Sequence, residues 1–182
     1  MKHVPALLAA IPVSIAMLLS STTARASEWT TPPPNLVQAT ARIFTSGQPP
    51  AKSLEGLKAQ GFEAVVYLAP PTVQDAVADE ARIVGGQGLV FVNIPVVFDN
   101  PTERDFETFV AVMKALGARK VLVHCQVNLR ASSMVFLYRT IVGRENPEVA
   151  WKDVEKIWTP QGAWKRLIDG QLRKHGIAFE PF

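Results

Sequence analysis

The chain has 182 residues, of which 19 are basic (Lys and Arg) and 16 are acidic, and its basic residues form no continuous run. Nucleic acid is therefore excluded as a partner, because proteins that bind it gather Lys and Arg in one patch or segment. The one cysteine, Cys125, excludes an internal disulfide.

Residues 1–26 predict a signal peptide. They combine a short basic start, an apolar stretch over 4–19 and a small-x-small cleavage motif, Ala24-Arg25-Ala26. The apolar stretch is short for a membrane span, so we expect a protein secreted to the periplasm with no membrane association after cleavage. Cleavage leaves 156 residues with 17 basic and 16 acidic side chains, which is enough for one domain.

Residues 27–38 predict an extended N-terminal arm, because three consecutive prolines begin at Pro32. Residues 39–182 predict a single α/β domain. Short apolar runs alternate there with segments of helical periodicity. This alternation favours right-handed crossovers and a mostly parallel sheet of four or five strands flanked by helices.

Four apolar runs predict the main strands of that sheet. They cover residues 41–46, 62–68, 89–96 and 120–123. The run at 62–68 has a continuous apolar centre, as buried parallel strands have. The first run is expected to lie at an edge of the sheet.

Helices are predicted between these strands. One covers 50–60 and ends at Gly61. Thr72 and Thr102 each begin a capping-box pattern with an aspartate three residues later, so helices are predicted from both positions, the first ending near residue 85. Asp75 and Glu80 are interpreted as solvated charges on the first of these two helices.

The C-terminal part of the chain predicts two short helices. Asn146-Pro147 and Thr159-Pro160 each combine an N-cap residue with proline at the first helical position. Trp151, Trp158 and Trp164 are expected on these helices, packed over the sheet.

The stretch 120–134 carries the residues with the clearest chemistry. Cys125 follows the apolar run 120–123 and precedes a helical pattern, so its thiol is expected between the carboxyl end of a strand and a helix N-terminus. Backbone N–H groups bind anions at such a terminus, and the same field favours a thiolate. Arg130 lies at the positive end of the helix dipole, where a cation is unfavourable unless an anion binds beside it. The sequence therefore predicts a site for a tetrahedral anion with a nucleophile at its base.

This stretch resembles a known signature. His124-Cys125, a short loop, Arg130 and Ser132 are similar to the phosphate loop of cysteine-dependent protein tyrosine phosphatases, especially the dual-specificity type. The segments 45–49 and 64–68 resemble a bacterial branch, the phosphatase-like domain also found beside beta-lactamase-like hydrolases. The resemblance covers about residues 39–143. It implies an enzyme that needs no cofactor or metal and acts on a phosphorylated protein or a small phosphate ester through a phosphocysteine intermediate.

The resemblance also implies roles for individual residues. Cys125 corresponds to the nucleophile, Arg130 to the phosphate-binding arginine, and Asp99 to the general acid that precedes the cysteine in the family. Asp105 is a second acid candidate, more easily explained by helix capping. The phosphate-binding loop would consist of His124, Gln126, Val127, Asn128, Leu129 and Ser132, with His124 keeping the thiolate ionised and Ser132 assisting the departure of sulfur.

The loop departs from the family pattern in two ways. Four residues separate Cys125 from Arg130, where the family has five, and the loop contains no glycine. Asn128 is the residue expected to take the left-handed conformation that glycine usually supplies.

Two alternatives follow from the shorter loop. Sulfurtransferases of the rhodanese type also carry cysteine on a short loop, so Cys125 could hold a persulfide. A phosphate-binding module without catalysis is the third possibility. Asp99 discriminates between the first two, because phosphatase turnover needs a general acid and sulfur transfer does not.

Overall fold

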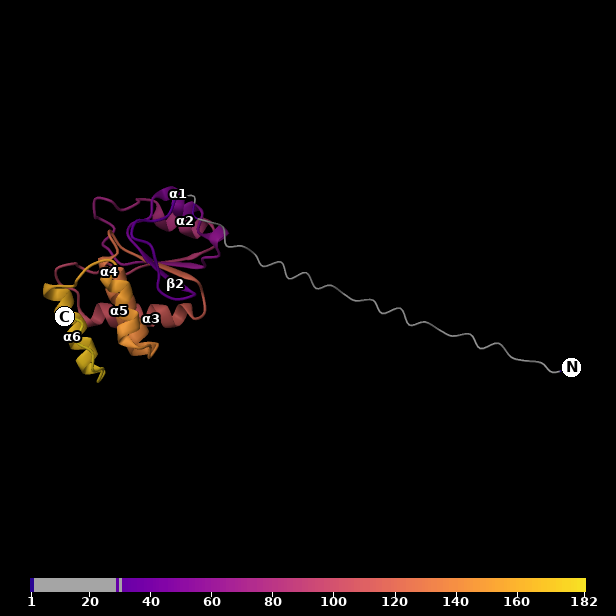
Figure 1. The fold of residues 1–182 in the computed structure, drawn as a ribbon. Coiled ribbons are helices and arrows are strands. Elements are labelled where there is room, and N and C mark those ends of the chain that lie inside the picture. The colour runs from indigo at the N-terminus through magenta and orange to yellow at the C-terminus, as the bar shows by residue number, and fades with distance from the viewer. Residues whose placement is uncertain (2–28, 30) are drawn as a thin grey trace.

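The computed structural model describes residues 1, 29 and 31–182. The predicted signal peptide lies outside the described residues apart from its first one. Residues 31–182 form an α/β domain in which one sheet lies between two layers of helices (Figure 1). No helix in the described part of the chain has both the length and the apolar character that crossing a bilayer requires.

The sheet has five strands in the order β1-β2-β5-β3-β4, and all except β1 are parallel. The strands are β1 (Val37–Gln38), β2 (Ile43–Ser46), β3 (Ala64–Tyr67), β4 (Val90–Asn93) and β5 (Val121–His124). In register, Ser46, His124, Tyr67 and Asn93 form one row along the carboxyl edge. The predicted parallel sheet is confirmed, but the edge position of the first predicted strand is wrong, because β1 pairs with the outer side of β2.

Six α-helices flank the sheet within residues 31–182. They are α1 (Ala51–Glu55), α2 (Glu80–Gly86), α3 (Glu103–Leu116), α4 (Leu129–Leu137) with the π-helical turn η2 (Tyr138–Val142), α5 (Pro147–Glu155) and α6 (Gly162–Lys174). A 3₁₀ turn, η1 (Lys58–Gln60), follows α1 and ends at Gly61, whose φ is 80°. The predicted helix over 50–60 is therefore divided, although it ends where expected.

Helices α1 and α2 cover one face of the sheet, and α3, α4, α5 and α6 cover the other (Figure 1). Side chains of the central strands alternate between the two faces. Val65 and Leu122 belong to the smaller core under α1 and α2, whereas Val66 and Val123 belong to the larger core. The nucleophile candidate Cys125 is part of that larger core.

Two of the predicted helix starts are confirmed. The Thr102 side chain accepts a hydrogen bond from Asp105 N–H, and the Asp105 side chain accepts one from Thr102 N–H, which completes a capping box. Asn146 caps α5, with Pro147 at the first helical position.

Two other predicted helix starts are wrong. Residues 72–79 form turns and α2 begins only at Glu80, because Asp75 binds Gln126 instead of closing a capping box with Thr72. Helix α6 begins at Gly162, because the backbone is still extended at the N-cap residue Gln161, and Pro160 lies buried ahead of the helix.

The C-terminal helices pack against the larger core as expected. Trp151 lies on α5 and Trp164 on α6, and both are buried. Trp158, however, lies in the connection between these helices and is only partly buried.

Candidate active site

Cys125 lies directly after β5, at the carboxyl edge of the sheet, and is fully buried. Its N–H donates a hydrogen bond of 3.2 Å to the carbonyl of Ser46 on the neighbouring strand. Helix α4 begins four residues later. The thiol therefore lies between a strand end and a helix N-terminus, as the sequence predicts.

Asn128 turns the chain between Cys125 and α4. Its φ of 74° and ψ of 2° are left-handed, which confirms the conformation predicted for this residue. The side-chain amide donates to the carbonyl of Asn35 (2.7 Å) and to Oγ1 of Thr45 (3.0 Å), and the backbone carbonyl accepts from Ser132 N–H (2.9 Å). These bonds shape a short loop that contains no glycine.

Gly47, on the segment after β2, allows that segment to approach the loop closely. A Cβ atom on Gly47 would lie 2.9 Å from the carbonyl oxygen of Gln126. Next to it, Gln48 N–H donates to that same oxygen (2.9 Å), and Val127 accepts a bond from the Asn35 side chain (3.1 Å). The segment after β2 thus supports the loop through close backbone contact.

Arg130 is the second residue of α4 and is 5% exposed. Its Nε donates to the carbonyl of Val96 (3.0 Å), its Nη1 donates to Oε1 of Gln126 (3.4 Å), and its Cζ lies 5.0 Å from the ring centre of Phe98. None of the ion pairs within residues 31–182 involves Arg130. A buried guanidinium without a carboxylate partner is suited to binding an anion.

Leu129 and Ser132 complete the predicted loop residues. Leu129 is the first residue of α4, and its carbonyl accepts from the hydroxyl of Ser132 (3.2 Å) and from that of Ser133 (2.9 Å). The Ser132 hydroxyl therefore bonds to the helix backbone in this structure.

Asp99 and Asp75 are exposed carboxylates near the loop, on different segments. Asp99 lies in a turn closed by Asn100 N–H and the carbonyl of Val97 (3.2 Å), next to the Phe98 ring that faces Arg130. Asp75 accepts a hydrogen bond of 3.0 Å from the side chain of Gln126. Sequence reasoning placed Asp75 on a helix and missed this contact, because no local pattern links it to a loop 51 residues away.

Glu80 is the main correction to the sequence interpretation. It is 3% exposed instead of solvated, and its Oε1 lies 2.6 Å from Nε2 of the fully buried His124. Its Oε2 accepts from Nε2 of Gln48 (2.9 Å). The contact with His124 is short, but neither atom has the angle of a directed hydrogen bond, and Nδ1 of His124 has no partner among the described residues. The site thus includes a buried carboxylate next to the residue that precedes Cys125.

Tyr67 lies beside this pair. Its ring stacks on that of His124, with ring centres 4.6 Å apart and planes 12° apart, and its hydroxyl donates to the carbonyl of Pro70 (3.3 Å). Burial raises the pKa of Tyr67 to about 12, with further contributions from the negative charges of Glu80, Asp75 and Cys125 and an opposing one from Arg130. Tyr67 is therefore neutral at physiological pH.

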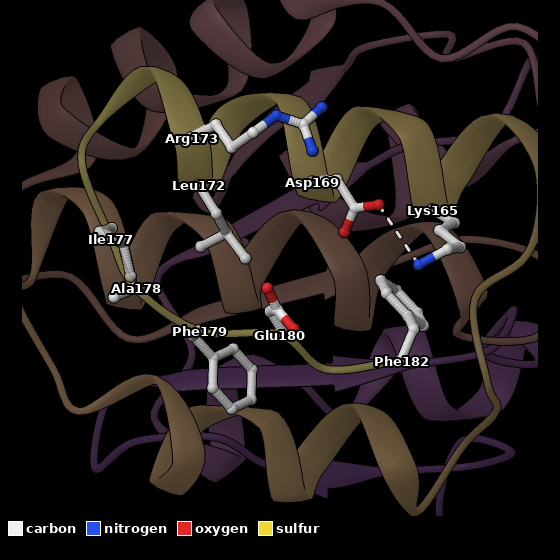
Figure 2. A pocket seen from close by; sticks show the side chains of 9 residues that line it. All are labelled: Lys165, Asp169, Leu172, Arg173, Ile177, Ala178, Phe179, Glu180 and Phe182. Carbon is white, nitrogen blue, oxygen red and sulfur yellow. Dashed lines mark ion pairs between the residues drawn. The ribbon is translucent and has the colours of Figure 1, made fainter.

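A separate hollow of about 340 Å³ lies between α6 and the C-terminal segment (Figure 2). Lys165 pairs with Asp169 (3.3 Å) and lies 3.8 Å from the ring centre of Phe182. None of the predicted site residues lines this hollow. Within residues 31–182, no three His, Cys, Asp or Glu side chains are grouped so that they could hold a metal ion.

Comparison with known proteins gives a consistent result. The model of the family described as "DSP-PTPase phosphatase fused to NAD+ Kinase" matches residues 24–165. A solved structure from Shewanella putrefaciens CN-32, a DUF442 protein assigned as a phosphatase, is 31% identical with a TM-score of 0.71, and the match covers 78% of this chain and 93% of that one. No curated protein matches the chain.

More distant structures share the fold. The core catalytic domain of the PP-IP phosphatase SIW14 from S. cerevisiae is 12% identical with a TM-score of 0.64, covering 80% of this chain and 87% of that one. Tk-PTP is 19% identical with a TM-score of 0.60, covering 78% and 95%.

Proposed function

The chain belongs to the dual-specificity type of the cysteine-dependent protein tyrosine phosphatases, which are phosphoric monoester hydrolases, and we propose that it hydrolyses phosphate monoesters through a phosphocysteine intermediate. The observation that carries the proposal is the arrangement of Cys125 and Arg130. A buried thiol and a buried guanidinium without a carboxylate lie at the two ends of a loop that reverses at Asn128.

In the first step, the Cys125 thiolate attacks phosphorus. The S–P bond forms while the bond from phosphorus to the leaving oxygen breaks. Arg130 binds the phosphoryl oxygens through its remaining N–H groups, together with amides at the start of α4, whose first turn leaves N–H groups without helical partners. Asp99 donates its proton to the leaving oxygen.

In the second step, water attacks the phosphocysteine. The Asp99 carboxylate takes a proton from this water as the new O–P bond forms, and the S–P bond breaks to return the thiolate. Ser132 is proposed to donate a hydrogen bond to the departing sulfur, which requires its hydroxyl to leave the carbonyl of Leu129.

The rim of the site supports a substrate with one phosphate group. The loops at the carboxyl edge, residues 31–36, 47–50, 68–79, 94–102 and 125–128, are all described and contain no Lys or Arg. Asp75, Asp99, Val97 and Val127 are exposed on these loops, whereas Asp79 lies directly before α2 and pairs with Arg82 of that helix. A phosphorylated protein or a small phosphate ester with an otherwise uncharged leaving group fits this rim better than a polyphosphate.

We further propose export to the periplasm with cleavage after Ala26, followed by an arm over 27–38, whose last two residues form β1, and a phosphatase domain over 39–182. The basic start, apolar stretch and cleavage motif support this. Expression of the full chain in a bacterium with two membranes, followed by osmotic release and N-terminal sequencing, tests it. A protein retained in the cytoplasm with residues 1–26 intact would contradict export.

The experiment that tests the activity is hydrolysis of para-nitrophenyl phosphate by the exported protein under reducing conditions. We expect turnover that disappears in Cys125→Ser, and a phosphoryl group on Cys125 after acid quenching. Absence of turnover in the wild type would reject hydrolysis of simple aryl esters. Thiosulfate sulfur transfer and phosphate binding by calorimetry would then decide between a sulfurtransferase and a binding module.

A further inference from the structure

Glu80 and His124 form a buried pair, and His124 directly precedes the nucleophile candidate Cys125. A carboxylate withdrawn from water is costly unless a nearby charge compensates it. The hydrogen bond from Gln48 satisfies one oxygen of Glu80 but supplies no charge. The other oxygen faces the imidazole of His124 at 2.6 Å.

The other charged or titratable groups around the pair do not neutralise Glu80. Tyr67 from β3 is neutral, since its pKa is about 12. Asp75, on the loop after β3, and Cys125 carry negative charge or none. Arg130 of α4 is positive, but it bonds to the Val96 carbonyl and to Gln126. His124 is therefore the group in contact with Glu80 that can carry a compensating charge.

We propose that Glu80 is a positioning residue that holds His124 as an imidazolium and thereby stabilises the Cys125 thiolate. With a neutral imidazole, the Glu80 charge would oppose a thiolate at the next residue. With an imidazolium, the Glu80 charge is offset and a positive charge lies on the residue that directly precedes Cys125. Tyr67 fixes the plane of the imidazole by stacking, and Gln48 fixes the carboxylate.

An effect of Glu80 on turnover rests on the proposed phosphatase mechanism. An effect of Glu80 on the ionisation of the Cys125 thiol does not depend on that mechanism. Alkylation by iodoacetamide reports the thiolate without any phosphate substrate: the sulfur forms a bond to the methylene carbon and iodide leaves. The rate should be measured from about pH 5 to about pH 9 on the exported wild type, Glu80→Gln and Asp79→Asn. Asp79 is the matched control, because it precedes Glu80 but is exposed and paired with Arg82 (2.6 Å).

Glu80→Gln is expected to slow alkylation by as much as about tenfold at the acid end of the range and to approach the wild-type rate at the alkaline end, which corresponds to a shift of the curve by about one pH unit. Asp79→Asn is expected to follow the wild type. An unchanged curve for Glu80→Gln overturns the inference. An equal decrease at every pH also overturns it, because this indicates a general structural defect.

A second measurement tests the proposal without the Glu80→Gln variant, in case that variant does not fold. After export, His124 and His175 are the histidines that remain, so His175→Gln leaves one imidazole. Nitrogen NMR of this protein in the reduced state should show both ring nitrogens protonated at neutral pH, and a neutral imidazole overturns the inference. If alkylation shifts as expected while no variant hydrolyses a phosphate ester, the proposed function fails and the positioning role of Glu80 stands.

Discussion

Arg130 Nε donates a hydrogen bond of 3.0 Å to the carbonyl oxygen of Val96, and this bond joins the start of α4 to the segment that carries Asp99. The planar guanidinium of arginine can donate to this carbonyl and to a phosphate at the same time, whereas the ammonium group of lysine lacks this geometry. We expect Arg130→Lys to lower kcat/KM for para-nitrophenyl phosphate by about 100-fold, consistent with loss of a charge-assisted hydrogen bond worth about 1.5–3 kcal/mol. Steady-state kinetics and inhibition by inorganic phosphate measure this effect.

Arg119→Lys is the matched control, because Arg119 also donates to a backbone carbonyl, that of Leu116 (3.2 Å), on the opposite end of α3 from the site. This variant should retain wild-type kinetics. Near-normal activity of Arg130→Lys would contradict the proposed role of Arg130 in binding the phosphoryl oxygens.

Asp99→Asn should lower turnover by a factor that depends on the leaving group. General acid catalysis contributes about 10²–10⁴-fold, and less for a leaving group that needs little protonation. The decrease should therefore be larger for phenyl phosphate than for para-nitrophenyl phosphate. Asp75→Asn, which removes the other exposed carboxylate near the loop, should show no such dependence; the reverse pattern would assign the acid to Asp75.

Asn128→Ala should destabilise the protein more than Asn128→Gly. Alanine in the left-handed conformation costs about 1–2 kcal/mol, whereas glycine adopts it freely. Both variants lose the bonds to Asn35 and Thr45, at about 1 kcal/mol each. Urea unfolding should therefore give a loss of about 3–4 kcal/mol for alanine and about 2 kcal/mol for glycine, and equal losses would show that φ is not constrained.

The raised pKa of Tyr67 predicts that the folded protein loses stability in alkaline solution. Its pKa is raised from the ordinary value of 10.0 to about 12 in the folded protein, so above pH 10.0 the unfolded chain releases a proton that the folded protein keeps. Its contribution to the free energy of unfolding is complete below pH 10.0 and is lost as the pH rises toward 12. Urea midpoints should therefore fall more steeply in the wild type than in Tyr67→Phe over this range, and parallel curves would contradict the assignment.

The response of the enzyme to substrate charge and to salt tests whether the loops around the site lack positive charge. Because the loops around the site contain no Lys or Arg, kcat/KM for an aryl phosphate should depend only weakly on salt concentration. Inositol hexakisphosphate should be neither a good substrate nor a strong inhibitor. Competitive inhibition by this compound at concentrations well below the KM for the aryl phosphate would show that the site accepts polyphosphates.

The features that sequence reasoning predicted correctly are local ones. Apolar runs and breaker residues identified the parallel strands, and side chains within three residues of each other identified the caps at Thr102 and Asn146. Asn128 was also predictable, because few residues other than glycine enter the left-handed region at low cost.

The features that it missed depend on residues far apart in the chain. Glu80 has an ordinary helix-forming context, and its burial results from contacts with Gln48 and His124, which β2 and β5 bring to the same edge of the sheet. The capping pattern at Thr72 failed for the same reason, because Asp75 has a more distant partner in Gln126. No periodicity encodes such pairs.

The bond between Asn128 and Asn35 spans 93 positions of the chain. The loop that carries the nucleophile therefore depends for its shape on a segment synthesised long before it. Contacts between residues so distant in sequence form late, since a large loop must close first. During refolding, catalytic competence should accordingly return no earlier than the pairing of β2 with β5, whose partners also lie far apart in the chain.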